Sequence, residues 1–304
     1  MNLQDQTVGI FADALMLSED FADGNIAIIS SLIKEIITIK YDDFADFKNQ
    51  AIKVYDRTFK KIKQTYVDDL AAMGSNITDD MHQAIRAGDN GKRVNKLTTR
   101  ELGSVIRQSV FEGEPLFQHN PLDERLEAQR VKSQKEVLGA VKRGINNGAT
   151  PQQLTKKIQG ILGGEKNAAD RIARTTANAV GNNTLLTTFK NNSHLIEGVM
   201  HSTTLDSRTC MRCVSVSDVT YPVGRQPYML PLHFRCRCVW VPMLYGDKPI
   251  VQTYEKWFAS QPPERQLRIL GPVRFELYKT GKVRVKDFAK DLRIKRLGDL
   301  PKAN

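Results

Sequence analysis

The residues best suited to chemistry in this sequence are its four cysteines, because all of them lie in one short stretch together with a histidine. They form the pairs Cys210/Cys213 and Cys236/Cys238, and His233 stands just ahead of the second pair. Two cysteines separated by two residues can direct both sulfurs to one ion, and a second group of donors about twenty residues later commonly completes a tetrahedral zinc site. Thiolate and imidazole donors favour zinc. We therefore predict a zinc site in which Cys210 and Cys213 are joined by two or three of the later donors.

The two cysteine pairs require different local geometry. We expect Cys210 and Cys213 on a tight turn. On an extended strand Cys236 and Cys238 would point to the same face, with Arg237 on the opposite face. Five donors for four positions leave no open place for water, and no glutamate lies between Cys210 and Cys238 to act as a general base. The pattern thus predicts a structural zinc that folds a segment rich in proline and turns.

Two other uses of the cysteines stay open at this point. Two disulfides would suit a secreted domain, but the sequence begins without the basic segment of a signal peptide, and a chain of 304 residues does not need such cross-links. Cysteines can also be buried as free apolar side chains. We favour the metal site, and we expect the protein to be made in a reducing cytoplasm.

The charge of the chain is positive overall and unevenly distributed. The net charge is +11, yet residues 1–74 carry 8 basic and 12 acidic side chains, whereas residues 200–304 carry 19 and 9. A basic C-terminal part is typical of contact with a polyanion, although a solvated face or an acidic protein partner would give the same pattern. Contact with DNA would be non-specific and sensitive to salt. The side chains that we predict to contact phosphate groups are Lys282, Arg284, Lys286, Lys290, Arg293, Lys295 and Arg296.

Other functional classes find little support in the sequence. The chain has no run of 18 apolar residues, so we expect no membrane-spanning helix. The glycines at 160–164 lack the Gly-Lys-Ser/Thr of a phosphate loop, and no Gly-x-Ser-x-Gly sequence occurs. We therefore expect no small-molecule substrate.

The pattern of apolar residues predicts a mainly α protein with a small zinc-stabilised β segment, α+β overall. We expect four regions: an acidic helical region at 1–74, a helical middle domain at 75–195, the zinc-bearing β segment at 196–250, and a basic helical region at 251–304. Within the first region residues 7–72 have helical periodicity, and Gly74-Ser75-Asn76 is predicted to end it.

Helix boundaries in the middle region have clear local signals. Thr98 with Glu101 forms a capping-box pattern that opens a helix predicted to reach Phe111. A second helix is expected at 122–147. Thr150 followed by Pro151 is typical of the start of the next helix, which the glycines at 160–164 should end before another helix at 167–190. Short helices are expected at 253–259, 263–270 and 273–280.

Two stretches of the zinc segment resemble a known family. Leu205–Cys213 (LDSRTCMRC) and Pro231–Cys238 (PLHFRCRC) are similar to the head-morphogenesis proteins of tailed phages, the Mu F-like minor head proteins. That family typically has a Thr-Leu-Asp-x-Arg-Thr-Cys-x-x-Cys stretch and closes with His-x-x-Cys-Arg-Cys. Arg171–Thr175 resembles its arginine-rich helix, in which Glu usually follows where this chain has Thr176. The resemblance covers about residues 90–290.

The resemblance implies a non-enzymatic structural component of the phage head, present in few copies. Such a protein would be assembled in the host cytoplasm and reside in the virion, in the head interior or at the portal vertex. Its partners would be the portal protein and capsid or scaffold proteins, and its role would lie in capsid assembly, DNA packaging or ejection.

Two functions of other classes compete with this interpretation. A zinc-stabilised nuclease would use the histidines and carboxylates nearest the cysteines, and it would need an oxygen-rich divalent site beside a general base. Those residues are His201, His233, Asp206 and Asp218. A zinc-bearing DNA-binding regulator would need a recognition helix, and none directly follows the second group of ligands.

Overall fold

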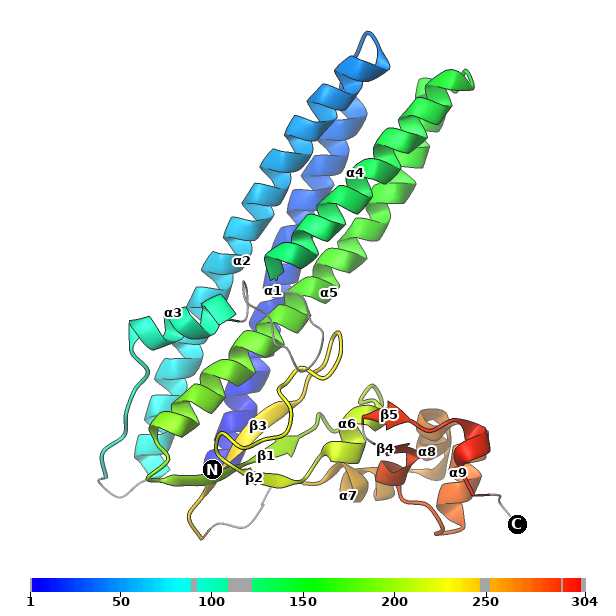
Figure 1. Cartoon of the computed structure of the whole chain (residues 1–304). Coiled ribbons are helices and arrows are strands. Elements are labelled where there is room, and N and C mark those ends of the chain that lie inside the picture. Colours follow the sequence, from blue (N-terminus) through cyan, green and yellow to red (C-terminus); the bar gives the residue numbers. More distant parts are fainter. Residues whose placement is uncertain (1, 89–91, 109–121, 247–251, 291, 302–304) are drawn as a thin grey trace.

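Four long helices form an elongated bundle in the computed structural model, which describes residues 2–88, 92–108, 122–246, 252–290 and 292–301. The helices pair as two hairpins whose tips lie at the same end of the bundle (Figure 1). The shorter α3 (Thr99–Arg107) packs against α2 and α5. The bundle helices are α1 (Leu3–Thr38), α2 (Phe44–Gly88), α4 (Leu122–Asn146) and α5 (Pro151–Asn191).

The buried stripe of α1 shows why this sequence forms a bundle. From Phe11 to Ile36 its buried residues recur at steps of three or four, which is close to the spacing of a coiled-coil seam. The stripe includes two polar residues, Ser18 and Asn25, and both bond to carbonyl groups of their own helix. A helix of this length gains most of its stability from packing such a face against its neighbours, here α2 and α5.

The predicted helix starts at Thr98 and Thr150 are confirmed. In each, the threonine hydroxyl accepts the backbone N–H of the third helical residue, and that residue's side chain accepts the backbone N–H of the threonine. Pro151 occupies the first turn of α5, where its missing N–H costs nothing. The predicted end of the first of these helices at Phe111 lies outside the described residues.

The predicted helix ends at glycine are wrong in two places. α2 runs through Gly74 to Gly88, and α5 runs through Gly160, Gly163 and Gly164. At Gly74 an added Cβ would lie 2.7 Å from Leu102 Cδ1, so this glycine serves close contact between α2 and α3. A glycine in a helix interior lowers stability by about 1 kcal/mol relative to alanine. The tertiary packing of two such long helices outweighs this loss.

A three-stranded antiparallel sheet lies at the base of the bundle, in the order β2-β1-β3. β1 (Ile196–Ser202) follows α5 after a four-residue turn and pairs with both β2 (Thr220–Pro222) and β3 (Val239–Leu244). An added Cβ at Gly198 would lie 2.8 Å from the Tyr221 carbonyl oxygen, so the β1–β2 pairing requires glycine there. The prediction of a mainly helical chain with a small β segment is confirmed.

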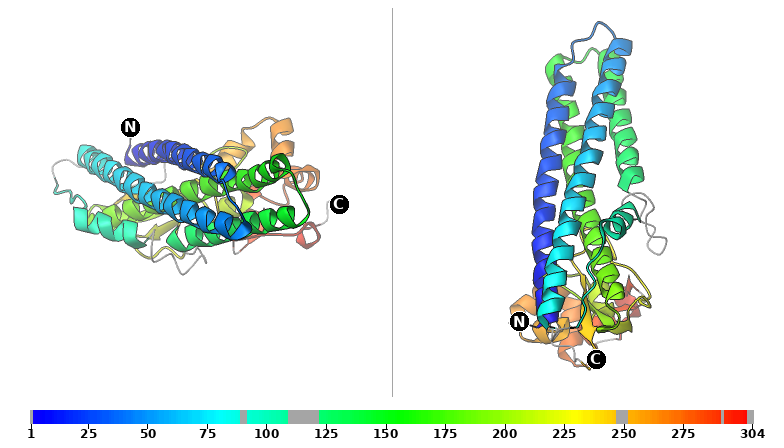
Figure 2. Two further views of the ribbon diagram at one scale, coloured as in Figure 1. Left: turned by 90° about the horizontal axis from the view of Figure 1, so that it is seen from above. Right: turned by 90° about the vertical axis from the view of Figure 1, so that its left-hand side faces the viewer.

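The C-terminal residues 252–290 and 292–301, which we call the C-terminal lobe, have a small apolar core of their own. Their helices confirm the three short helices expected: α7 (Tyr254–Ala259), α8 (Pro263–Leu270) and α9 (Pro272–Lys279). Two 3₁₀ turns and a two-stranded sheet complete the lobe: η3 (Val285–Phe288), β4 (Ala289–Lys290), β5 (Arg293–Ile294) and η4 (Leu297–Asp299). The lobe lies beside the base of the bundle, away from the hairpin tips (Figures 1 and 2).

One short helix joins the two parts of the molecule. α6 (Met211–Val216) packs against η3, β4 and β5 of the lobe. Its Cys213 belongs to the main core, whereas the neighbouring Val214 belongs to the core of the lobe. α2 also runs through residue 74, the boundary expected between the first two regions. Residues on both sides of this boundary therefore belong to one bundle. Within the described residues no helix is both long and apolar enough to cross a membrane.

Candidate metal centre

The first cysteine pair lies at the start of α6. Cys210 is the N-cap of this helix and Cys213 lies in its first turn, so the expected tight turn is the opening turn of a short helix. The two Sγ atoms are 3.6 Å apart. Helical spacing of three residues brings both sulfurs to one side, which is the arrangement that two ligands of one ion require.

His233 faces this pair from the loop before β3. Its Nε2 atom is 3.2 Å from Cys210 Sγ and 3.2 Å from Cys213 Sγ. Its Nδ1 atom is 2.8 Å from the Phe234 carbonyl oxygen, an acceptor that places the proton on Nδ1 when the ring is neutral. The lone pair of Nε2 is then directed at the two sulfurs, as in a metal ligand.

The second cysteine pair approaches from the other side. Cys236 Sγ lies 3.9 Å from Cys213 Sγ, and Cys236 and Cys238 are both buried while Arg237 between them is partly exposed. The alternation expected of an extended segment is therefore present. The strand itself begins later than expected, at Val239, because Arg235 has a left-handed backbone conformation with φ of 59°.

These five side chains form two overlapping triads that are close enough to hold a metal ion. One triad is Cys210, Cys213 and His233, and the other is Cys213, Cys236 and Cys238. In a tetrahedral zinc site, ligand distances imply S–S edges of roughly 3.8 Å and S–N edges of roughly 3.5 Å. The measured separations of 3.6, 3.9 and 3.2 Å fit those edges. Cys213 belongs to both triads, so it is the donor on which the whole centre depends.

The electrostatics of the cluster favour thiolate at Cys210 and Cys236, whereas neighbouring sulfurs and burial raise the pKa of Cys213 and of Cys238. The hydrogen bond between Cys210 and Cys213 is the main cause that lowers the pKa of Cys210 to about 4, and His233 adds to this against the opposing effect of burial. Hydrogen bonds with Cys210 and then Cys236 raise the pKa of His233 to about 10. A thiolate is the form of cysteine that binds metal. Burial of three of the four cysteines makes the site a closed one, which is typical of structural centres.

The part of the chain that contains this cluster matches a family model. Residues 135–241 match the model described as Phage Mu protein F like protein. This segment, which we call the Mu F-like segment, is therefore similar to Mu protein F. The match confirms the resemblance, over a narrower range than the residues 90–290 expected from the sequence. No curated protein and no solved structure matches the chain at a significant level.

The Mu F-like segment contains a set of side-chain hydrogen bonds from two asparagines, which we call the clasp and which was not predicted from the sequence. Two buried asparagines on α5, Asn178 and Asn182, donate to the Cys238 carbonyl oxygen, both at 3.1 Å. The Asn182 side-chain oxygen also accepts the backbone N–H of Trp240 at 2.9 Å. The clasp fixes Cys238 and the start of β3 to α5, the longest helix of the segment. Asparagine spaced by four residues on a helix was its only sequence signal, and that signal is weak.

His201 does not join the metal cluster. Its ring is fully buried between Tyr228 and Trp240, and its Nδ1 atom is 3.0 Å from the Tyr228 hydroxyl. Burial is the main cause that lowers its pKa to about 4, so the ring is neutral at physiological pH. A side chain with no exposed surface cannot reach a phosphodiester, so His201 is not available as a general base.

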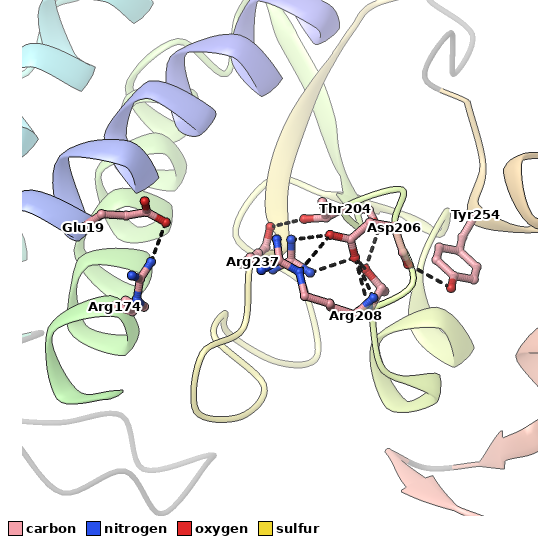
Figure 3. Close-up of polar contacts among 8 residues, drawn as sticks. Glu19, Arg174, Thr204, Asp206, Arg208, Arg237 and Tyr254 are labelled. Carbon is pink, nitrogen blue, oxygen red and sulfur yellow. Dashed lines mark hydrogen bonds and ion pairs between the residues drawn. The ribbon is translucent and has the colours of Figure 1, made fainter. Parts of the chain in front are cut away.

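Asp206 stabilises the Mu F-like segment by forming an ion pair with Arg237, the residue between Cys236 and Cys238. Both carboxylate oxygens accept from the guanidinium, at 2.6 and 2.8 Å (Figure 3). The same carboxylate accepts backbone N–H groups from Arg208 and Thr209, at the start of the Cys210 loop. Burial alone would raise the pKa of Asp206, but Arg237 and then Arg208 lower it to about 2. This carboxylate therefore connects the two ligand-bearing loops.

We expect Asp206→Asn to destabilise the metal-loaded protein by about 2 kcal/mol at pH 7, because the charged pairing with Arg237 that lowers the pKa of Asp206 is lost. A lowered pKa in the folded state means that this stability is present above about pH 4 and is lost as the pH falls toward 2. Chemical denaturation of both proteins at pH 7 measures the difference. Glu276→Gln is the control, because its exposed pair with Lys279 should contribute less than about 1 kcal/mol. Equal losses of stability in the two variants would contradict the stabilising role of Asp206.

Proposed function

We propose that this chain is a minor head protein of a tailed phage that lies at or near the portal and assists capsid assembly, DNA packaging or ejection. The observation that supports this proposal most directly is the Mu F-like match at residues 135–241. The family suggests a head-morphogenesis protein that resides in the virion and contacts other virion proteins. The long bundle supports a scaffolding role, because it presents extended helical faces on which a portal, capsid or scaffold protein could pack.

We propose that the metal is zinc and that it stabilises the fold without taking part in catalysis. The ligands would be Cys210 and Cys213 together with two or three of His233, Cys236 and Cys238, which form two triads that share Cys213. Bound zinc would hold the donors as thiolates and neutral imidazole. The segment between β1 and β3 has one short helix and one short strand, so it has little other means of fixing its shape.

We further propose that the C-terminal lobe contacts packaged DNA through its basic face. Among the seven residues predicted from the sequence, Lys282, Lys290, Arg293 and Arg296 are exposed. Arg284 is exposed but is paired with Asp287, while Lys286 and Lys295 are partly buried. The four exposed side chains are therefore the ones expected to contribute most to phosphate contact.

Replacing these four residues together with glutamine is expected to lower affinity for a DNA duplex and to flatten its salt dependence. Each lost phosphate contact should reduce the slope of log K against log salt by about 0.9. Fluorescence anisotropy across a salt series measures the slope. The matched control replaces four exposed lysines of α2, Lys48, Lys53, Lys60 and Lys61, and changes the charge equally. A slope that falls equally in both variants would mean that net charge, and not the lobe, governs binding.

The alternative of a zinc-stabilised nuclease receives no comparable support. His201 is buried in the aromatic core, and Asp206 is held by two arginines. His233 directs its Nε2 atom at the cysteines. No set of residues near the cluster combines an accessible base with an oxygen-rich divalent site, within the part of the chain that the structure describes.

Quantitative mass spectrometry of purified phage particles tests the proposed function. With the portal protein as internal standard, we expect a low and fixed ratio of this chain to portal. Absence from particles, combined with abundance in the infected-cell cytoplasm, would overturn the structural role.

A further inference from the structure

A groove of 930 Å³ separates the start of α1 from the metal-binding loops. Its walls come from α1, α5, the loop after β1 and the residues just before β3. One wall is apolar: Val8, Ala12 and Leu15 occur at helical spacing along α1, and Met16 beside them is 68% exposed. Three residues spaced in this way form the stripe against which a further helix can pack.

The opposite wall and the rim of the groove are rich in arginine. Arg174 bonds to Glu19 and Asp170, and Figure 3 shows the Arg174–Glu19 pair facing the cluster around Arg237 across the groove. Arg235 shares Asp170, and Arg208 shares Asp206 with Arg237. Four guanidinium groups thus share three carboxylates, and the groove keeps an excess of positive charge. Two of the four are well exposed: the side chain of Arg208 at 79% and that of Arg235 at 52%.

We propose that this groove binds an amphipathic, acidic helical segment of another virion protein. The apolar stripe of α1 would receive the apolar face of that segment, and methionine at the edge adapts readily to an incoming surface. Carboxylates of the segment would bond to Arg208 and Arg235, since charge-assisted bonds to arginine are among the stronger polar contacts. Nucleic acid fits less well, because a phosphate backbone gains nothing from an apolar wall. This inference rests on the proposed function, because it identifies the kind of surface by which the chain joins the particle.

Site-specific photo-cross-linking in assembled particles tests the proposal. A benzophenone amino acid at position 16, at the rim of the groove, is expected to cross-link to a segment that combines apolar and acidic residues in a different virion protein. The matched position is Val131, an exposed apolar residue of α4 outside the groove, which should not cross-link to that segment.

Charge variants then test the arginines. Arg208→Gln combined with Arg235→Gln should lower the cross-linking yield at position 16 about tenfold, as expected from the loss of charge-assisted bonds. Arg57→Gln is the control, because Arg57 is an equally exposed arginine in an ion pair on the bundle, and it should leave the yield unchanged.

Three results would overturn the inference while leaving the proposed function intact. They are a cross-link from position 16 to a second copy of this chain, a cross-link to a segment without acidic residues, and no cross-link from protein present in the particles. Absence of the chain from particles would overturn both.

Discussion

Removal of the proposed zinc is expected to release α6 and the C-terminal lobe while the four-helix bundle stays folded. Structural zinc contributes about 10–16 kcal/mol in small zinc-binding domains at neutral pH, more than a short loop segment can replace by packing. α6 has six residues and connects the two cores, through Cys213 on one side and Val214 on the other. Without the ion, the packing of α6 against the lobe should loosen, whereas the seams between α1, α2, α4 and α5 do not involve the cysteines.

Hydrogen exchange measured by mass spectrometry, before and after chelation, distinguishes the two parts. Protection should fall in residues 203–238 and 252–301 and persist in the bundle, and the far-UV helical signal should change little. Cys213→Ala should reproduce the chelated state, since Cys213 belongs to both donor triads. Ser215→Ala on the same helix is the control, because its hydroxyl bonds only within one turn, to the Arg212 carbonyl. Unchanged exchange in a protein proven to be metal-free would contradict the stabilising role.

Asn182→Ala is expected to destabilise the metal-loaded protein by about 2–4 kcal/mol. The Asn182 side chain is completely buried and makes bonds to the Cys238 carbonyl and the Trp240 N–H. Alanine would leave the N–H of a fully buried strand residue without this acceptor and would open a cavity beside the donor loop. Chemical denaturation followed by tryptophan fluorescence measures the loss.

Two further variants make this prediction specific. Asn178→Ala should cost less, about 1 kcal/mol, because the Cys238 carbonyl keeps its bond from Asn182. Gln64→Ala removes an exposed amide that donates to Asp68 on α2, and it should change stability by less than about 0.5 kcal/mol. Equal costs for the three substitutions would show that the clasp has no special role.

Features that depend on local chemistry could be predicted from the sequence. The donor spacing predicted which side chains gather at one point, and the structure brings all five together. The helix starts at Thr98 and Thr150 were predictable because a cap is satisfied within four residues of the chain. The family resemblance was likewise visible in contiguous residues around the cysteines, and the match at residues 135–241 includes them.

Features whose cause lies far away in the chain could not be predicted without the fold. Gly74 does not end α2, because Leu102 packs on it and long-range packing outweighs the local preference of glycine. His201 stands near the cysteines in sequence but is directed into an aromatic core by the pairing of β1 with β3. The clasp from Asn182 and the groove beside α1 join residues from distant elements. Local spacing specifies a ligand set, but burial and the spaces between elements arise only once the chain has folded.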